Sequence, residues 1–116
     1  MSKSVSTETR FFEVPEDFPL ERGETLRGAR VAYRTWGERR QVATLVCHAL
    51  TGNADADDWW AGLFGPGRTL DPERDFVISV NVLGGCYGTT GPTSPRPGHE
   101  GWYGPAFPDV TIRDMV

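Results

Sequence analysis

Two loops rich in glycine and hydroxyl side chains each follow an apolar stretch of the chain. The first reads HALTGN, from His48 to Asn53, and the second reads NVLGGCYGTTGPTSP, from Asn81 to Pro95. Backbone N–H groups in a tight glycine-containing turn after a strand can point at one spot and stabilise the oxyanion of acyl transfer, each donor contributing about 3–4 kcal/mol. These two loops are therefore the candidates for chemistry.

Two continuous apolar runs lie directly before these loops and predict strands. They are ATLVCHAL, from Ala43 to Leu50, and DFVISVNVL, from Asp75 to Leu83. Such runs are typical of a parallel sheet that is buried on both faces. Ligands of open α/β sheets bind beyond the carboxyl ends of the strands. We therefore expect both loops at the same edge of the sheet.

Shorter patterns predict the remaining elements. Residues 11–14 (FFEV) suit a short strand, and alternation over residues 29–36 (ARVAYRTW) predicts an antiparallel strand with one solvated face. The segment DADDWW predicts a turn or two of helix that begins near Asp57 and Asp58. A last helix is expected to begin in residues 111–116, with Asp109 or Thr111 as its cap.

These elements are too few for a complete α/β domain. Two parallel strands and an incipient helix do not close a doubly wound sheet, and a loop of about 25 residues is unusual in a compact domain unless it is functional. We expect residues 1–10 to form a flexible arm. Residues 11–116 are expected to form the incomplete first part of a larger α/β protein, with a mostly parallel sheet and an antiparallel N-terminal strand.

Composition excludes several classes of protein. The 116 residues carry a net charge of −4 and contain no basic block, which argues against a nucleic-acid partner. No run approaches the roughly 18 apolar residues of a membrane helix, and the polar N-terminus does not resemble a signal peptide, so a cytoplasmic location is expected. Two cysteines are then expected to stay reduced. Cys47 and His48 face opposite sides of a strand, so we expect no metal site.

Several reactive side chains also have structural interpretations. His48 is more simply a histidine bonded to nearby backbone than a catalytic base, because no nucleophile accompanies it. Cys86 is interpreted as a packed side chain, with a reactive thiol as the alternative. Asp57 and Asp58 are interpreted as solvated residues at a helix start, with an acid/base couple as the alternative. Asn81 is expected to bond the loop backbone, with substrate contact as the alternative.

Four segments taken together resemble a known family. HALTGN, WWAGLFGPG, NVLGGCYGTTGPTSP and FPDVTIRDMV occur in this order between Phe11 and Val116. They resemble the N-terminal part of the homoserine O-acetyltransferases, which are α/β-hydrolase-fold enzymes of methionine biosynthesis. The resemblance implies a ping-pong reaction in which the serine of a Ser-His-Asp triad takes an acetyl group from acetyl-CoA and passes it to the hydroxyl of homoserine. Acetyl-CoA is then a substrate, and no bound cofactor is implied.

The resemblance also implies roles for residues of both loops. The backbone N–H of Leu50 would donate to the oxyanion, while Thr51 and Gly52 shape the turn. The wall of the substrate pocket would consist of Asn81, Gly84, Gly85, Gly88, Thr89 and Thr90. The sequence departs from the family after this loop, since residues 94–97 read SPRP where S-x-N-P is common.

No triad residue is identified in the chain. None of its five serines has glycine two places away on both sides, so the G-x-S-x-G nucleophile elbow is absent from these 116 residues. We therefore expect the isolated chain to be inactive. The alternatives are a homoserine or serine O-succinyltransferase of the same family, or a truncated, non-catalytic binding protein that pairs its exposed strands with a partner. The resemblance implies small-molecule substrates, homoserine and an acyl-CoA, and a homodimer for the full-length protein.

Overall fold

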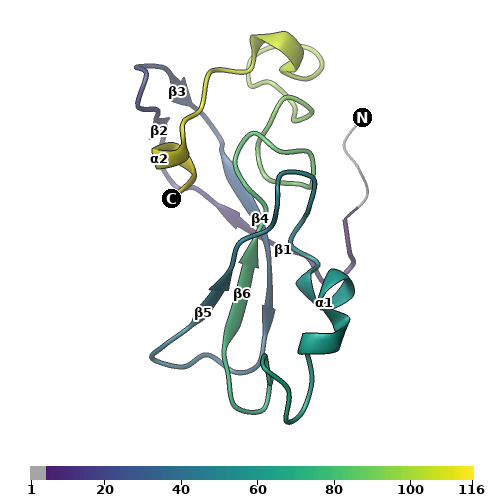
Figure 1. Cartoon of the computed structure of the whole chain (residues 1–116). Coiled ribbons are helices and arrows are strands. Elements are labelled where there is room, and N and C mark those ends of the chain that lie inside the picture. Colours follow the sequence, from purple (N-terminus) through teal and green to yellow (C-terminus); the bar gives the residue numbers. More distant parts are fainter. Residues whose placement is uncertain (1–4) are drawn as a thin grey trace.

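The computed structural model describes residues 5–116, and its centre is a four-stranded mixed sheet (Figure 1). In spatial order the strands are β1 (Arg10–Glu13), β4 (Arg30–Trp36), β6 (Val77–Val80) and β5 (Thr44–Val46). β4 pairs antiparallel with both β1 and β6, whereas β5 and β6 are parallel. The expected parallel pair and the expected antiparallel strand at 29–36 are therefore confirmed.

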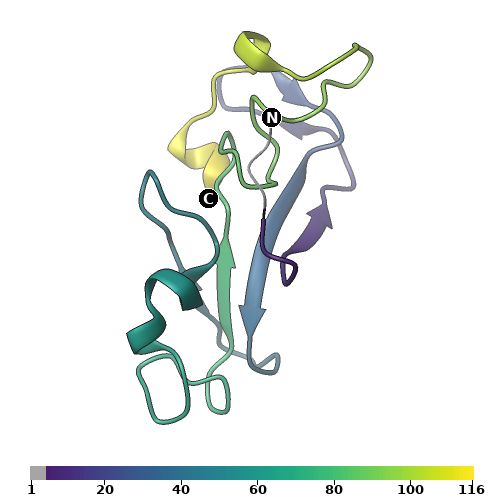
Figure 2. The same cartoon turned by 90° about the vertical axis from the view of Figure 1, so that its right-hand side faces the viewer.

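Short elements complete the fold at the two ends of the molecule. They are the hairpin of β2 (Phe18–Pro19) and β3 (Thr25–Leu26), the helices α1 (Ala56–Trp59) and α2 (Ile112–Met115), and the 3₁₀ helices η1 (Ala61–Leu63) and η2 (Gly104–Ala106). Figures 1 and 2 both place α1 at one end and the β2–β3 hairpin with α2 at the other. The molecule is accordingly elongated, measuring 48 × 28 × 21 Å.

Each end of the molecule has its own small core. Near α1, the buried side chains of Val46, Ala56, Leu70 and Val77 pack together, with Trp36 and Phe64 at the edge. At the other end, Leu20, Leu26 and Ala29 pack against partly buried residues of the hairpin and of the C-terminal segment, including Phe107 and Val110. The sheet therefore joins two clusters and does not enclose a single core.

The strands that precede the two loops are shorter and less buried than the sequence predicts. β5 ends at Val46 and β6 at Val80, so both apolar runs continue into loops. The expected burial on both faces is wrong for β5, because Leu45 is 60% exposed. Within the described residues, α1 packs against one face of β5 and β6, while the other face borders a hollow of about 370 Å³.

The N-terminal segment is only partly described. Residues 1–4 of the predicted flexible arm lie outside the described residues. Beyond them, the carbonyl oxygen of Ser6 accepts a hydrogen bond from the Thr9 N–H at 3.0 Å, and β1 begins at Arg10. The flexibility of the arm stays a prediction.

The C-terminal helix α2 begins with a capping box at Thr111, one of the two residues predicted as its cap. Thr111 is the N-cap, and its hydroxyl accepts from the Asp114 N–H while the Asp114 carboxylate accepts from the Thr111 N–H at 2.8 Å. The same carboxylate accepts from the Glu21 N–H at 2.9 Å, from the turn that joins β2 to β3. Asp114 therefore both caps α2 and ties it to the hairpin.

The Asp114 cap predicts a specific dependence of stability on pH. Hydrogen bonds from the Thr111 backbone, and then from the Glu21 backbone, hold the pKa of Asp114 below its ordinary value of 3.8. A carboxyl with a lowered pKa in the folded state stabilises the fold above its unfolded pKa, and that contribution is lost as the pH falls through the folded pKa. Asp114→Ala should therefore destabilise the protein near neutral pH and have little effect in strong acid.

Urea unfolding of the full-length protein, meaning the complete product of the reading frame that contains this chain, measures this effect. The difference in the free energy of unfolding between the unsubstituted protein and Asp114→Ala is measured from pH 7 down to strong acid. Asp109→Ala is the control, because Asp109 is an exposed carboxylate that pairs with Arg22 at 3.5 Å. A loss of unfolding free energy in Asp114→Ala that is the same at every pH contradicts the prediction.

Candidate active site

A tight turn follows β5, and several of its backbone donors, Leu50 among them, have no partner within the described residues. The Gly52 N–H closes the turn by donating to the carbonyl oxygen of Ala49 at 2.8 Å. The N–H of Leu50 makes no hydrogen bond within the described part of the chain, and its side chain is fully exposed. The first loop therefore presents a backbone N–H at the carboxyl end of a parallel strand, where such donors bind developing negative charge.

His48 connects this turn to the second loop. Its Nε2 accepts a hydrogen bond from the Val82 N–H at 3.3 Å, so the proton resides on Nδ1, which donates to the Ala49 carbonyl oxygen at 2.7 Å. The interpretation of His48 as a histidine bonded to backbone is confirmed. The bond to Val82 also confirms that the two loops lie at the same edge of the sheet.

The polar side chains of the second loop are buried and bonded within the protein. Asn81, only 4% exposed, accepts from the Ala54 N–H through Oδ1 at 2.9 Å. Its carbonyl oxygen accepts from the Thr89 hydroxyl at 2.6 Å, and that hydroxyl accepts from the Ala32 N–H at 2.9 Å. Thr90 is bonded to the backbone of Arg30 in the same way, at 2.9 Å. The default interpretation of Asn81, that it bonds loop backbone, is confirmed.

Glycine is required where the second loop crosses β4. Gly88 has a φ of +97°, and a Cβ there would lie 3.0 Å from the Cβ of Ala32 and 3.1 Å from the ring of Phe11. Both the backbone conformation and the close approach exclude a larger residue. Thr89 and Thr90 follow at once, and their bonds to β4 fix the loop against the sheet.

A small cavity of about 50 Å³ lies where the two loops meet. Leu50 and Gly52 line it from the first loop, and Asn81, Gly85 and Cys86 line it from the second. The other predicted site residues, Thr51, Gly84, Gly88, Thr89 and Thr90, do not line this cavity. Arg96, in the SPRP segment, lines a different hollow beside the β2–β3 hairpin.

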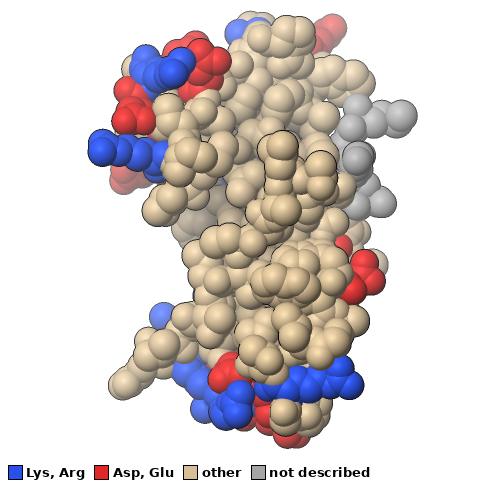
Figure 3. Space-filling model, viewed as in Figure 1, with Lys and Arg blue, Asp and Glu red and all other residues tan. Residues whose placement is uncertain are grey.

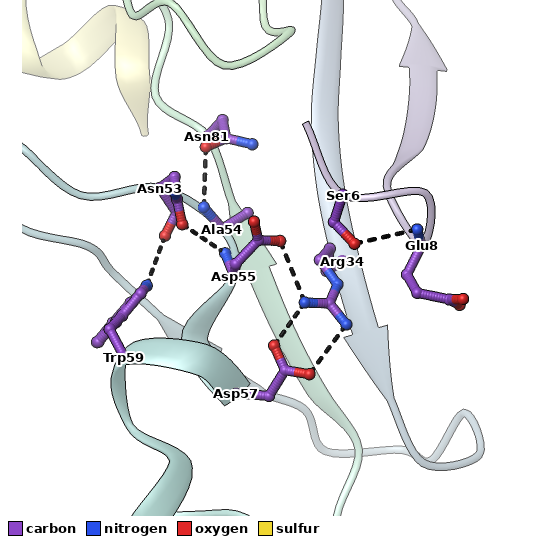
Figure 4. A network of polar contacts seen from close by, with 9 residues as sticks. All are labelled: Ser6, Glu8, Arg34, Asn53, Ala54, Asp55, Asp57, Trp59 and Asn81. Carbon is purple, nitrogen blue, oxygen red and sulfur yellow. Dashed lines mark hydrogen bonds and ion pairs between the residues drawn. The ribbon is translucent and has the colours of Figure 1, made fainter. Parts of the chain in front are cut away.

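Sequence reasoning missed a cluster beside the first loop in which a buried arginine pairs with two partly exposed carboxylates (Figure 4). Arg34 of β4 is 8% exposed, and its guanidinium donates to the Asp55 carboxylate at 3.1 Å and to both carboxylate oxygens of Asp57. Burial alone would lower the pKa of Arg34, but the hydrogen bonds and charges of Asp57 and Asp55 outweigh it and raise that pKa. The pair of carboxylates is thus bound to a cation.

One expectation about this region is therefore wrong. Asp57 is not simply a solvated residue at a helix start, because its two carboxylate oxygens accept bidentate hydrogen bonds from the Arg34 guanidinium. Arg34 lies on the same face of β4 as the fully buried Ala32, two residues before it, so alternation along the strand places this arginine inside the protein. That alternation was the one signal in the sequence that could have revealed a buried arginine.

The rest of the surface formed by residues 5–116 shows no other centre for chemistry. Cys47 and Cys86 are both free thiols. Among the described residues, no group of three or more His, Cys, Asp or Glu side chains could hold a metal ion, and no helix is long and apolar enough to cross a membrane. Figure 3 shows acidic and basic side chains mixed at the two ends of the visible face, with few between them.

Comparison with solved structures defines the class of the fold. The chain is similar to the crystal structure of esterase E22, with a TM-score of 0.79 and 32% identity, over 93% of this chain and 34% of that one. It is also similar to homoserine O-acetyltransferase from Bacillus anthracis, with a TM-score of 0.77 and 28% identity, over 91% and 33% respectively. The fold is the N-terminal part of an α/β-hydrolase fold.

Curated relatives show which enzymes the chain is similar to in sequence. Homoserine O-acetyltransferases from Chlorobaculum tepidum and Nostoc punctiforme are 57% and 52% identical over 97% and 99% of this chain. No family model matches. The chain spans about one third of the length of these relatives, 32% and 33%. It is therefore homologous to the N-terminal third of the homoserine O-acetyltransferases.

Proposed function

We propose that this chain is the N-terminal part of a homoserine O-acetyltransferase, which transfers acetyl from acetyl-CoA to the hydroxyl of L-homoserine. The observation that carries the proposal is the 57% identity over almost the whole chain to an enzyme of that name. The unpaired Leu50 N–H at the end of a parallel strand supports it, because acyl transfer requires such a donor.

In the proposed mechanism, the nucleophilic serine comes from outside these 116 residues. Its hydroxyl attacks the thioester carbon of acetyl-CoA and gives its proton to the triad histidine. The resulting oxyanion accepts a hydrogen bond from the Leu50 N–H. The intermediate then collapses, and the CoA thiolate leaves with the proton. The homoserine hydroxyl then attacks the acyl-enzyme and gives its proton to the triad histidine. The second oxyanion collapses to O-acetylhomoserine, and the departing serine oxygen takes that proton back from the histidine.

The residues of both loops have distinct parts in this proposal. Thr51 and Gly52 shape the turn that presents the Leu50 N–H. The pocket wall formed by Asn81, Gly84, Gly85, Gly88, Thr89 and Thr90 acts mainly through backbone, because its polar side chains are bonded inside the protein. Gly85 is the glycine of this loop that reaches the cavity beside Leu50.

The proposal extends to location and assembly. Two free cysteines favour a reducing compartment, so we place the enzyme in the cytoplasm. The homodimer is proposed from the resemblance to the family alone. Homoserine and acetyl-CoA would be its small-molecule partners.

Ester hydrolysis is a second candidate, favoured by the similarity to esterase E22. The same acyl-enzyme would form, and water would take the place of homoserine. Within the family itself, succinyl-CoA as donor or serine as acceptor remains the alternative chemistry.

Release of free CoA by the full-length protein distinguishes these functions. We expect release from acetyl-CoA that depends on L-homoserine and exceeds release with succinyl-CoA or with L-serine. Hydrolysis of p-nitrophenyl acetate without homoserine-dependent transfer would favour the esterase. A full-length protein with neither activity would favour a binding protein. The 116 residues alone should transfer no acetyl, and measurable transfer by them would contradict the proposed origin of the nucleophile.

A further inference from the structure

The segment that follows the Leu50 turn is attached to two strands at once (Figure 4). Asn81, at the end of β6, accepts from the Ala54 N–H at 2.9 Å. Arg34, on β4, binds the carboxylates of Asp55 and Asp57. Ala54 itself is buried. Every residue from 54 to 57 is therefore fixed either directly or by its neighbours.

The Arg34 contact differs from the other ion pairs of the described residues. The arginine side chains of those pairs are 65–87% exposed, whereas the Arg34 side chain is 10% exposed. Surface pairs contribute little because water competes for both charges. A buried arginine with two carboxylates, one of them bound in a fork, has a fixed geometry that a lysine cannot reproduce.

Asn53 also holds the downstream end of the turn, because its Oδ1 accepts from the Asp55 N–H at 2.9 Å and its carbonyl oxygen accepts from Trp59 Nε1 at 3.1 Å. His48 holds the upstream end through Ala49 and Val82. The Leu50 side chain is fully exposed and so contributes no packing. The direction of the Leu50 N–H is consequently determined by how the chain is held on either side of the turn.

We propose that Arg34 is a positioning residue for this enzyme: through Asp57 and Asp55 it fixes the start of α1 and thereby aims the Leu50 N–H at the oxyanion. The expected effect on catalysis rests on the proposed function, whereas the expected effect on the position of the Leu50 turn does not. The oxyanion forms only during the reaction. A misdirected donor therefore reduces stabilisation of the transition state and leaves the binding of substrate in the ground state largely unchanged.

Two substitutions in the full-length protein test the proposal. Arg34→Lys keeps the positive charge and removes the bidentate hydrogen bonding to Asp57. Asp57→Asn keeps the shape of the side chain and removes its negative charge. We expect kcat to fall about tenfold or more in each, with KM changed less than about twofold. Hydrogen exchange should become faster in residues 48–54 and stay unchanged in β4. Arg113→Lys is the matched control, because its pair with Glu21 lies on the surface at 3.8 Å.

The outcomes separate this inference from the proposed function. Unchanged exchange at 48–54 in a folded Arg34→Lys protein overturns the positioning role, whether or not the protein is an acetyltransferase. A rise in KM that accounts for the whole loss of kcat/KM also overturns it. If the unsubstituted protein transfers no acetyl, the proposed function fails, and the exchange measurement still decides the role of Arg34. Should Arg34→Lys not fold, the milder Asp57→Asn provides the same comparison.

Discussion

Replacing Leu50 by proline is expected to lower kcat for acetyl transfer by about 10²–10³-fold, the effect of removing one oxyanion donor. Proline has no N–H, so the substitution deletes the atom proposed to bind the oxyanion. KM for acetyl-CoA and homoserine should change little, because the hydrogen bond forms only as negative charge develops. Steady-state kinetics of the full-length protein, with both substrates varied, measures the effect.

Leu50→Ala is the matched control for this substitution. It shortens a side chain that is fully exposed and keeps the backbone N–H, so its kcat should stay close to that of the unsubstituted protein. The Leu50 N–H makes no hydrogen bond in the described structure, so its removal breaks none of the hydrogen bonds of the turn. Equal kcat values for the two variants would show that another group binds the oxyanion.

Replacing Gly91 by alanine is expected to destabilise the protein by about 1–3 kcal/mol, the usual cost of inserting a carbon where no space exists. A Cβ at this position would overlap the carbonyl oxygen of Gly85 and lie 3.0 Å from the carbonyl carbon of Gly84. Both are backbone atoms, so no side chain can rotate to relieve the contact. The Gly91 N–H is also bonded to the Ser94 hydroxyl at 2.9 Å, which restricts its own movement.

Gly91→Ala should also lower activity, because Gly85, which the added carbon would displace, lines the cavity beside Leu50. Urea unfolding and steady-state kinetics of the full-length protein measure the two effects. Gly62→Ala is the control: a Cβ there meets no atom within 4 Å, so its stability should change by less than about 0.5 kcal/mol. Equal stability of the two variants would mean that the second loop adjusts freely.

Local signals in the sequence predicted much of the fold. The Thr111 cap follows from a hydroxyl and a carboxylate three residues apart, which satisfy each other's backbone N–H groups. The shared edge of the two loops follows from the direction of two parallel strands. Strand ends were harder to predict, because residues 47–50 are as apolar as β5 yet lie beyond its pairing with β6.

The candidate site was predicted less completely, because its supports are not local. Arg34 and Asp57 are 23 residues apart, and no pattern in the chain links a strand arginine to that particular carboxylate. The two loops were recognisable from glycine and hydroxyl content. The donor role of Leu50 came from family resemblance alone, since a backbone N–H has no signature in the side-chain sequence. The structure added the contacts on either side of the turn that contains Leu50.

The strand order β1-β4-β6-β5 has a consequence for biosynthesis. β4 and β5 are consecutive along the chain but do not touch, because β6, which is synthesised later, lies between them. On the ribosome, the edges of β4 and β5 that later pair with β6 therefore stay open until Val80 has emerged. Such unpaired edges can pair with other chains. We therefore expect chaperone binding to matter most while this part of the chain is being translated.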